Sequence, residues 1–77
     1  MKIKVLFFSA AAETAGTDFI FLEDVHTTER ATIELHEKFP ALKGLHCRFA
    51  LNKMILNESV PLSDGDELAV LPPFSGG

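Results

Sequence analysis

Apolar side chains recur at every second position near the start of the chain, with the period of a β-strand. One face is wholly apolar and consists of Ile3, Val5 and Phe7. The opposite face starts with lysines and turns apolar at Leu6 and Phe8. The pattern predicts a strand over residues 2–9, with Leu6 and Phe8 either covered by another element or forming an exposed patch.

Two short elements follow this strand. Ala10 to Ala15 is a run of good helix formers, and Gly16 stands where a helix C-cap is expected. Residues 18–22 contain four successive large apolar side chains, which are typical of a strand. Because fewer than ten residues separate the two strands, an antiparallel hairpin is predicted.

One longer helix is predicted in the middle of the chain. Thr27 or Thr28 can cap its start, and Pro40 ends it, because the residue before a proline avoids the α region. Glu34 and Lys38 have the spacing of an ion pair on its outer side. The core-facing positions recur every four residues and are Ala31, Leu35 and Phe39.

The last third of the chain is predicted to form short strands and a tail. Strands are predicted at residues 48–51, 53–56 and 67–71, with a turn at residues 63–66. A right-handed crossover through the long helix would place the last strand parallel to the first and beside it. The expected fold is therefore α+β, a β-grasp (ubiquitin-like) mixed sheet with one main helix across one face and a flexible C-terminal tail.

Composition and charge narrow the class of protein. At 77 residues, the chain has room for a single domain, residues 1–77, with residues 72–77 as its extended tail. The net charge is −4 and the seven basic residues are scattered, which argues against a nucleic-acid partner. No segment approaches the roughly 20 apolar residues that cross a membrane. A single cysteine, Cys47, fits the reducing conditions of the cytoplasm, where we expect the protein to work.

The expected folded body offers no catalytic or metal site. Its histidines and its cysteine lack the spacing of metal ligands, and the adjacent pair His46 and Cys47 reads as a surface imidazole beside a buried thiol. The aspartates around Gly65 lack the ligand spacing of a calcium loop. We therefore expect no metal, no bound cofactor and no catalytic centre within this chain.

The C-terminal segment has a distinct chemistry. Gly76 and Gly77 follow Ser75, and two terminal glycines arise by chance in about one chain in two hundred. Pro72 and Pro73 stiffen the chain as it leaves the last strand. Since glycine lacks a Cβ, such an arm can thread a narrow cleft and present its carboxylate there. A frayed or truncated terminus is the alternative interpretation.

The two ends of the chain resemble a known family. Residues 62–77, LSDGDELAVLPPFSGG, are similar to the C-terminal signature of the MoaD/ThiS ubiquitin-like sulfur-carrier family. Residues 4–9, KVLFFS, and the helical segment after them resemble its molybdopterin branch more than its thiamin branch. Phe74 stands where a smaller aliphatic residue is usual.

The resemblance implies a carrier function for Gly77. A ubiquitin-activating-like adenylyltransferase would use ATP to form an acyl-adenylate on Gly77, and a persulfide sulfur donor would convert it to a thiocarboxylate. The tail would then enter the large subunit of molybdopterin synthase, in a heterotetramer, and give its sulfur to cyclic pyranopterin monophosphate. The predicted parallel pairing of the first and last strands places Phe8 near Leu71, and the resemblance adds Ile55, with Phe74 at the base of the tail, to form a docking patch. The alternative is that Ile55 and Leu71 are ordinary core residues.

Other functions share parts of this chemistry. A carrier for thiamin, tungsten-cofactor or tRNA thiolation would use the same thiocarboxylate. A ubiquitin-like protein modifier would use the same acyl-adenylate but would end in an isopeptide bond to lysine. A pure binding module would not need a free diglycine. The sequence does not name the final sulfur acceptor.

Overall fold

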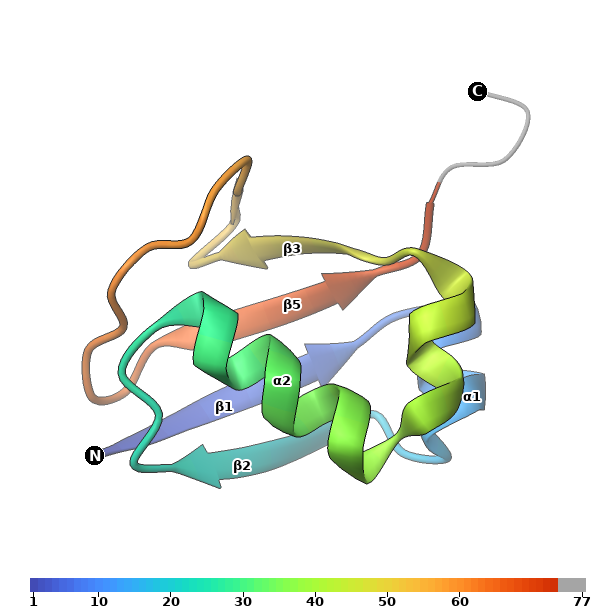
Figure 1. Cartoon of the computed structure of the whole chain (residues 1–77), viewed down its shortest axis with the longest axis horizontal. Helices are drawn as coiled ribbons and strands as arrows, with labels where there is room; N and C mark the ends of the chain where they lie inside the picture. The colour runs from blue at the N-terminus through green and yellow to red at the C-terminus, as the bar shows by residue number, and fades with distance from the viewer. Residues whose placement is uncertain (74–77) are drawn as a thin grey trace.

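The computed structural model describes residues 1–73 and shows one curved sheet with the longest helix across one of its faces (Figure 1). The elements follow the order that the sequence predicts, with one addition. They are β1 (Lys2–Phe7), α1 (Ala10–Ala15), β2 (Phe19–Glu23), α2 (Thr28–Lys38), the 3₁₀ helix η1 (Pro40–Leu45), β3 (Arg48–Leu51), β4 (Met54–Ile55) and β5 (Glu67–Leu71).

The sheet has the strand order β2-β1-β5-β3-β4. β1 pairs antiparallel with β2 and parallel with β5, so the hairpin and the crossover through α2 are both confirmed. β3 lies between β5 and β4 and is antiparallel to both. The predicted α+β β-grasp fold is therefore correct.

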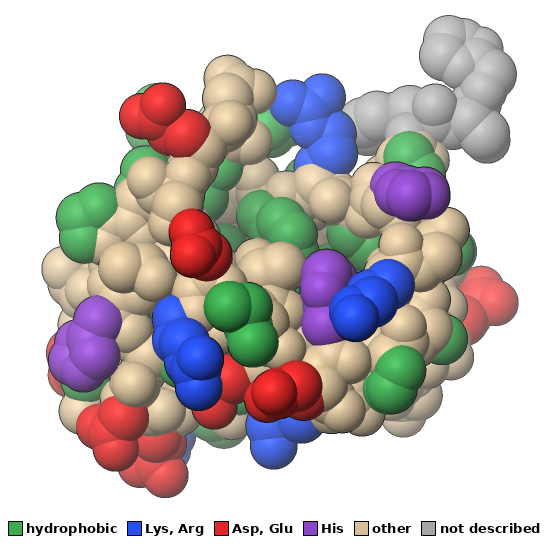
Figure 2. All heavy atoms as spheres, viewed as in Figure 1, with side chains coloured by type: hydrophobic (Ala, Val, Ile, Leu, Met, Phe, Trp, Pro, Cys, Tyr) green, Lys and Arg blue, Asp and Glu red, His purple; other side chains and the backbone are tan. Residues whose placement is uncertain are grey.

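The core lies between α2 and one face of the sheet. Ile3, Val5 and Phe7 are buried there, as their alternation predicts, and α2 contributes Ala31 and Leu35. The last predicted core position of the helix, Phe39, packs edge-on against Phe7 with ring centroids 5.5 Å apart. Figure 2, seen from the α2 side, shows charged side chains interspersed with separate hydrophobic ones.

The predicted helix boundaries agree with the structure. The Thr27 hydroxyl accepts a 3.1 Å hydrogen bond from the N–H of Arg30 and caps α2. Gly16 has φ 76°, the left-handed conformation that glycine adopts without a steric penalty, and it caps α1. Pro40 ends α2 but also begins η1, because a proline is tolerated in the first turn of a new helix.

Two local predictions are wrong. The strand expected at residues 53–56 is reduced to Met54–Ile55, because Asn52 and Lys53 both have positive φ and form the tight turn after β3. The pair expected between Glu34 and Lys38 does not form. Within residues 1–73 the single ion pair joins the N-terminal amine to Asp24 at 3.9 Å, and the buried Oε2 of Glu34 has no hydrogen-bond partner.

Candidate functional site

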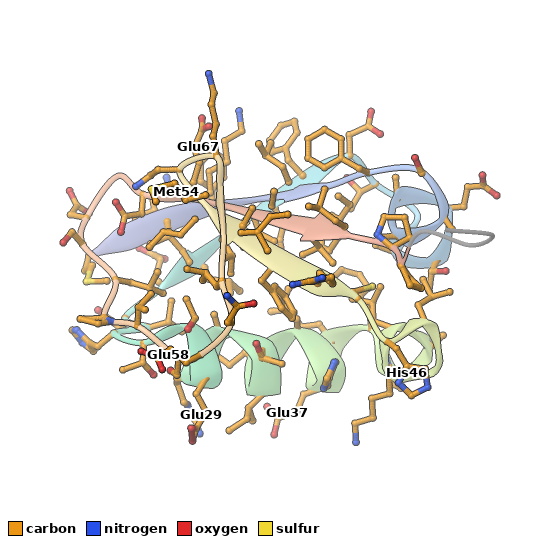
Figure 3. All side chains as sticks on the ribbon, turned by 90° about the horizontal axis from the view of Figure 1, so that it is seen from above. Glu29, Glu37, His46, Met54, Glu58 and Glu67 are labelled. Carbon is orange, nitrogen blue, oxygen red and sulfur yellow. The ribbon has the colours of Figure 1, made fainter. Side chains whose placement is uncertain are left out.

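The sheet face opposite α2 carries an apolar row that crosses all five strands. We call this side of the sheet the outer face; in Figure 3 it bears Glu67, whereas Glu29 and Glu37 lie on the α2 side. Residues that are paired across neighbouring strands point to the same face. The strand register therefore aligns one row from β2 to β4, which consists of Phe19, Leu6, Ala69, Ala50 and Ile55.

The tail leaves the sheet beside this row. β5 ends at Leu71, which is half-buried and paired with Arg48 on β3. Phe8 follows the end of β1 and is 44% exposed, and its N–H donates a 3.2 Å hydrogen bond to the carbonyl of Val70. Continuing the parallel register by one residue places Phe8 beside Leu71. Phe8 is therefore exposed at the point where the tail begins. Of the two interpretations that the sequence allowed for this side chain, the exposed patch is correct.

Ile55 belongs to the same face but not to the same end of it. It is 50% exposed on the edge strand β4, and β3 separates it from Leu71. Three strand spacings of about 4.8 Å each separate it from Phe8. The small side chains of Ala50 and Ala69 lie between Ile55 and Leu6 in the row, so this part of the outer face is a shallow surface rather than a cluster.

The tail itself is described only in part. Pro72 is half-buried and Pro73 is exposed directly after β5. The other predicted tail and patch residues lie outside the described residues; these are Phe74, Ser75, Gly76 and Gly77.

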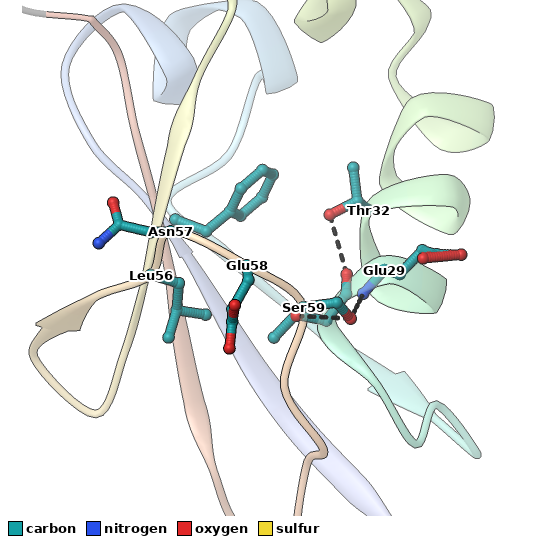
Figure 4. Close-up of a pocket in the computed structure, with 8 residues that line it drawn as sticks. Glu29, Thr32, Leu56, Asn57, Glu58 and Ser59 are labelled. Carbon is teal, nitrogen blue, oxygen red and sulfur yellow. Dashed lines mark hydrogen bonds between the residues drawn. The ribbon is translucent and has the colours of Figure 1, made fainter.

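One pocket lies between the first turn of α2 and the segment after β4 (Figure 4). It has a volume of about 360 Å³, with Phe49 and Leu56 among its apolar lining. Its polar groups already bond to one another: the Ser59 hydroxyl accepts from the Glu29 N–H at 3.1 Å and lies 3.3 Å from the Thr28 hydroxyl. These bonds join Ser59 to the first turn of α2, so the polar side of the pocket has a structural explanation.

Histidine, cysteine and carboxylate side chains are scattered over the described part of the chain. Among residues 1–73, no group of three His, Cys, Asp or Glu side chains is placed to hold a metal ion. His46 is exposed at the end of η1, and Cys47 is half-buried against the core. Burial raises the pKa of the Cys47 thiol above its ordinary value of 9.0, which disfavours the reactive thiolate.

Comparison with known proteins identifies the family. The ThiS family matches residues 5–77 of the chain. The chain belongs to this family. The resemblance found at the two ends of the sequence is thereby confirmed over nearly the whole length of this ThiS-family protein.

Relatives and solved structures agree with that assignment. The chain is 39% identical to the molybdopterin synthase sulfur carrier subunit of Chlamydomonas reinhardtii, over 100% of both chains. Its fold matches the small archaeal modifier protein SAMP1 from Haloferax volcanii with a TM-score of 0.85, 26% identity and 100% coverage of both chains. It also matches one chain in the structure of the complex of subunits 1 and 2 of molybdopterin-converting factor from Helicobacter pylori, with a TM-score of 0.77 and 29% identity, and the match covers 100% of this chain and 100% of that one.

Sequence reasoning missed part of the outer face of this ThiS-family chain. Phe19, Ala50 and Ala69 were not among the predicted patch residues, although they lie in one row with Ile55. The run from Phe19 to Leu22 is apolar at every position, so its alternation gives no signal of which side faces out.

Among the described residues, no helix is long and apolar enough to cross a membrane.

Proposed function

We propose that this ThiS-family chain is the sulfur-carrier subunit of a molybdopterin synthase. The observation that carries the proposal is the 39% identity, over the full length of both chains, to a protein named as that subunit. The fold is consistent with this function, because β5 brings Pro72 and Pro73 to the rim of an apolar sheet face. A partner that binds this face would receive the chain that follows.

The carrier group in this proposal is the carboxylate of Gly77, with Gly76 and Ser75 passing through the partner's channel. An oxygen of the carboxylate attacks the α-phosphate of ATP, which releases pyrophosphate and leaves an acyl-adenylate. The terminal sulfur of a persulfide then attacks the acyl carbon and expels AMP. The product is an acyl disulfide that joins Gly77 to the donor. A second thiol attacks the donor's sulfur in this disulfide, so the donor leaves as a disulfide with that thiol. Gly77 keeps the other sulfur as a thiocarboxylate. The activated carboxylate is electrophilic, whereas the thiocarboxylate is a nucleophile.

Three partners follow from this chemistry. A ubiquitin-activating-like adenylyltransferase binds the ATP, a persulfide protein supplies the sulfur, and the synthase large subunit accepts the loaded tail in a heterotetramer. We propose that the adenylyltransferase and the large subunit use the same patch in turn, formed by Phe8, Leu71, Ile55 and Phe74. Exposed apolar groups beside a reactive tail are typical of a docking surface. We place these steps in the cytoplasm, whose reducing conditions suit a chain with one cysteine.

Intact-mass measurement tests the carrier function. The protein is incubated with an adenylyltransferase of this class, ATP and a persulfide donor, and then with the large subunit and the cyclic pterin phosphate. We expect a gain equal to the mass difference between sulfur and oxygen, which is lost when the pterin is converted. A variant that lacks Gly77, or one extended beyond it, is the matched control and should gain nothing. An unchanged mass of the wild type with all components present would contradict the proposal.

A second candidate is a protein modifier, which the match to the small archaeal modifier protein favours. A modifier uses the same acyl-adenylate but transfers the Gly77 carbonyl to a lysine amine. The same mass experiment in a mixture of cytoplasmic proteins separates the two functions. A thiocarboxylate changes the mass of this chain alone, whereas a conjugate adds the mass of a whole acceptor protein.

A further inference from the structure

The edge of the sheet formed by β2 has unpaired backbone groups on its outer side. The carbonyl of Asp18 accepts a 2.8 Å hydrogen bond from the N–H of Phe7, and the N–H of Asp24 donates one of 2.9 Å to Met1. Successive residues of a strand direct their backbone groups to opposite sides. The even-numbered residues from 18 to 24 therefore face β1, and the residues that direct their N–H and C=O to the free edge are Phe19, Phe21 and Glu23.

This edge lacks the features that usually prevent strand pairing. Its sequence, FIFLE, contains no proline, no lysine and no bulge, and its single charge is Glu23. One contact occupies part of the edge, because the Thr17 hydroxyl donates to the Phe19 carbonyl at 3.1 Å. A carbonyl has two lone pairs, so that group can still accept a second hydrogen bond.

Two aromatic rings stand on the outer face of the same strand. Phe19 and Phe21 are 46% and 49% exposed, and their centroids lie 5.8 Å apart in an edge-on arrangement. The ammonium of Lys4 lies 4.7 Å from the Phe19 ring, and that of Lys2 lies 4.5 Å from the Phe21 ring. Neither lysine forms an ion pair within residues 1–73. Each cation is thus held over a ring and keeps hydrogen-bonding capacity for a carboxylate from outside.

We propose that the β2 edge pairs antiparallel with β2 of a second copy, with Phe21 opposite Phe21 of that copy. In this register, the residues that direct their backbone groups outward pair with one another across a twofold axis. Phe21 pairs with Phe21, and Phe19 pairs with Glu23. On the α2 side, half-buried Ile20 lies opposite Leu22 of the second copy. The two sheets become one continuous sheet of ten strands.

The charges fit this register and indicate that the β2 edge pairs with a second copy of this chain. Phe19 lies opposite Glu23 of the second copy, and the ammonium above Phe19 belongs to Lys4. Each Glu23 carboxylate therefore arrives beside a lysine that has no carboxylate partner in its own copy, and the twofold axis makes this contact twice. The pairing extends the sheet sideways, so Phe8 and Leu71 on the inner strands stay open to the partners proposed above.

Sedimentation equilibrium across dilutions from millimolar to low micromolar protein tests the pairing. We expect a weak monomer–dimer equilibrium for the wild type, as is typical of small interfaces. Phe21→Lys places like charges opposite each other at the twofold axis and should weaken dimerisation about tenfold or more. Ile33→Lys is the matched control, because Ile33 is 40% exposed on α2, and it should leave the equilibrium unchanged.

A charge exchange tests the register without changing an aromatic residue. Lys4→Glu and Glu23→Lys should each weaken the dimer several-fold, and the double variant should recover most of the loss. Amide hydrogen exchange gives a backbone readout: the N–H groups of Phe21 and Glu23 should become protected as the protein concentration rises. A wild type that is monomeric at millimolar concentration would overturn the proposal. So would a dimer insensitive to Phe21→Lys, or a Phe21→Lys variant that loses only large-subunit binding.

Discussion

The N–H of Phe8 donates a 3.2 Å hydrogen bond to the carbonyl of Val70, one residue beyond the last registered pair of β1 and β5. This bond holds the end of the first strand against the end of the last one. Phe7 turns into the core and Phe8 turns out, so an aromatic ring is exposed where the chain passes into Pro72. The position of the proposed docking patch follows from this one pairing.

Phe8→Asp should leave the monomer folded and weaken binding to both the adenylyltransferase and the large subunit. A buried aromatic anchor in an interface contributes about 2 kcal/mol or more, so we expect a loss of about thirtyfold in each affinity, measured by calorimetry. Ile33→Asp on α2 is the control and should bind normally. Failure of Phe8→Asp to fold would make Phe8 a core residue, and normal binding of both partners would place the interface elsewhere.

Gly76→Ala should impair adenylation or sulfur transfer without changing stability. The added Cβ widens the arm where it must pass a close-fitting channel, and it also restricts the backbone. Within residues 1–73 the buried core extends from Ile3 to Val70, so the melting temperature should stay within about one degree of the wild-type value. Single-turnover rates with the adenylyltransferase provide the measurement. Equal rates for the variant and the wild type would mean that the channel is wide.

Thr28→Val should destabilise the protein although it keeps the shape of a buried side chain. The Thr28 hydroxyl accepts a 2.9 Å hydrogen bond from the N–H of Val60, and Thr28 is 5% exposed. Valine leaves that N–H without its partner, which costs about 1–3 kcal/mol in the free energy of unfolding, measured with urea. Thr32→Val is the control, because the Thr32 hydroxyl only donates to a carbonyl one turn earlier in the helix. A loss as large in Thr32→Val would contradict the assigned role of Thr28.

The Cys47 thiol should ionise at higher pH in the folded protein than in the unfolded chain, because burial raises its pKa above 9.0. The folded state therefore keeps its proton longer, and the associated stability is complete below pH 9.0 and is lost as the pH rises beyond it. Alkylation by iodoacetamide should show a higher midpoint in native than in urea-denatured protein. The stability difference between the wild type and Cys47→Ala should also become smaller above that pH. Coinciding alkylation curves would show that the thiol is solvated.

Several elements follow from the sequence because their causes are local. The alternation of Ile3, Val5 and Phe7 sets the buried face of β1, whatever the neighbouring strands are. Gly16 and Gly65 both adopt positive φ, at the helix end and at the turn where the sequence predicts them. Backbone dihedral preferences and side-chain periods act within a few residues, so a single chain segment carries the whole signal. The same holds for the end of α2 before Pro40.

Only the tertiary structure decided which segments meet. The sequence shows two short strands after the helix, but not that β3 lies between β5 and β4, which moves Ile55 to the sheet edge. Nor does it indicate where the ammonium groups of Lys2 and Lys4 lie. Their cross-strand neighbours are Glu23 and Glu67, but the ammonium groups lie over aromatic rings instead. Strand order and register depend on contacts between residues that are far apart in the chain, and on which of several similar pairings buries the most apolar surface. For that reason the sequence determined most of the elements and the buried faces of β1 and α2, whereas packing determined the outer face and its free edge.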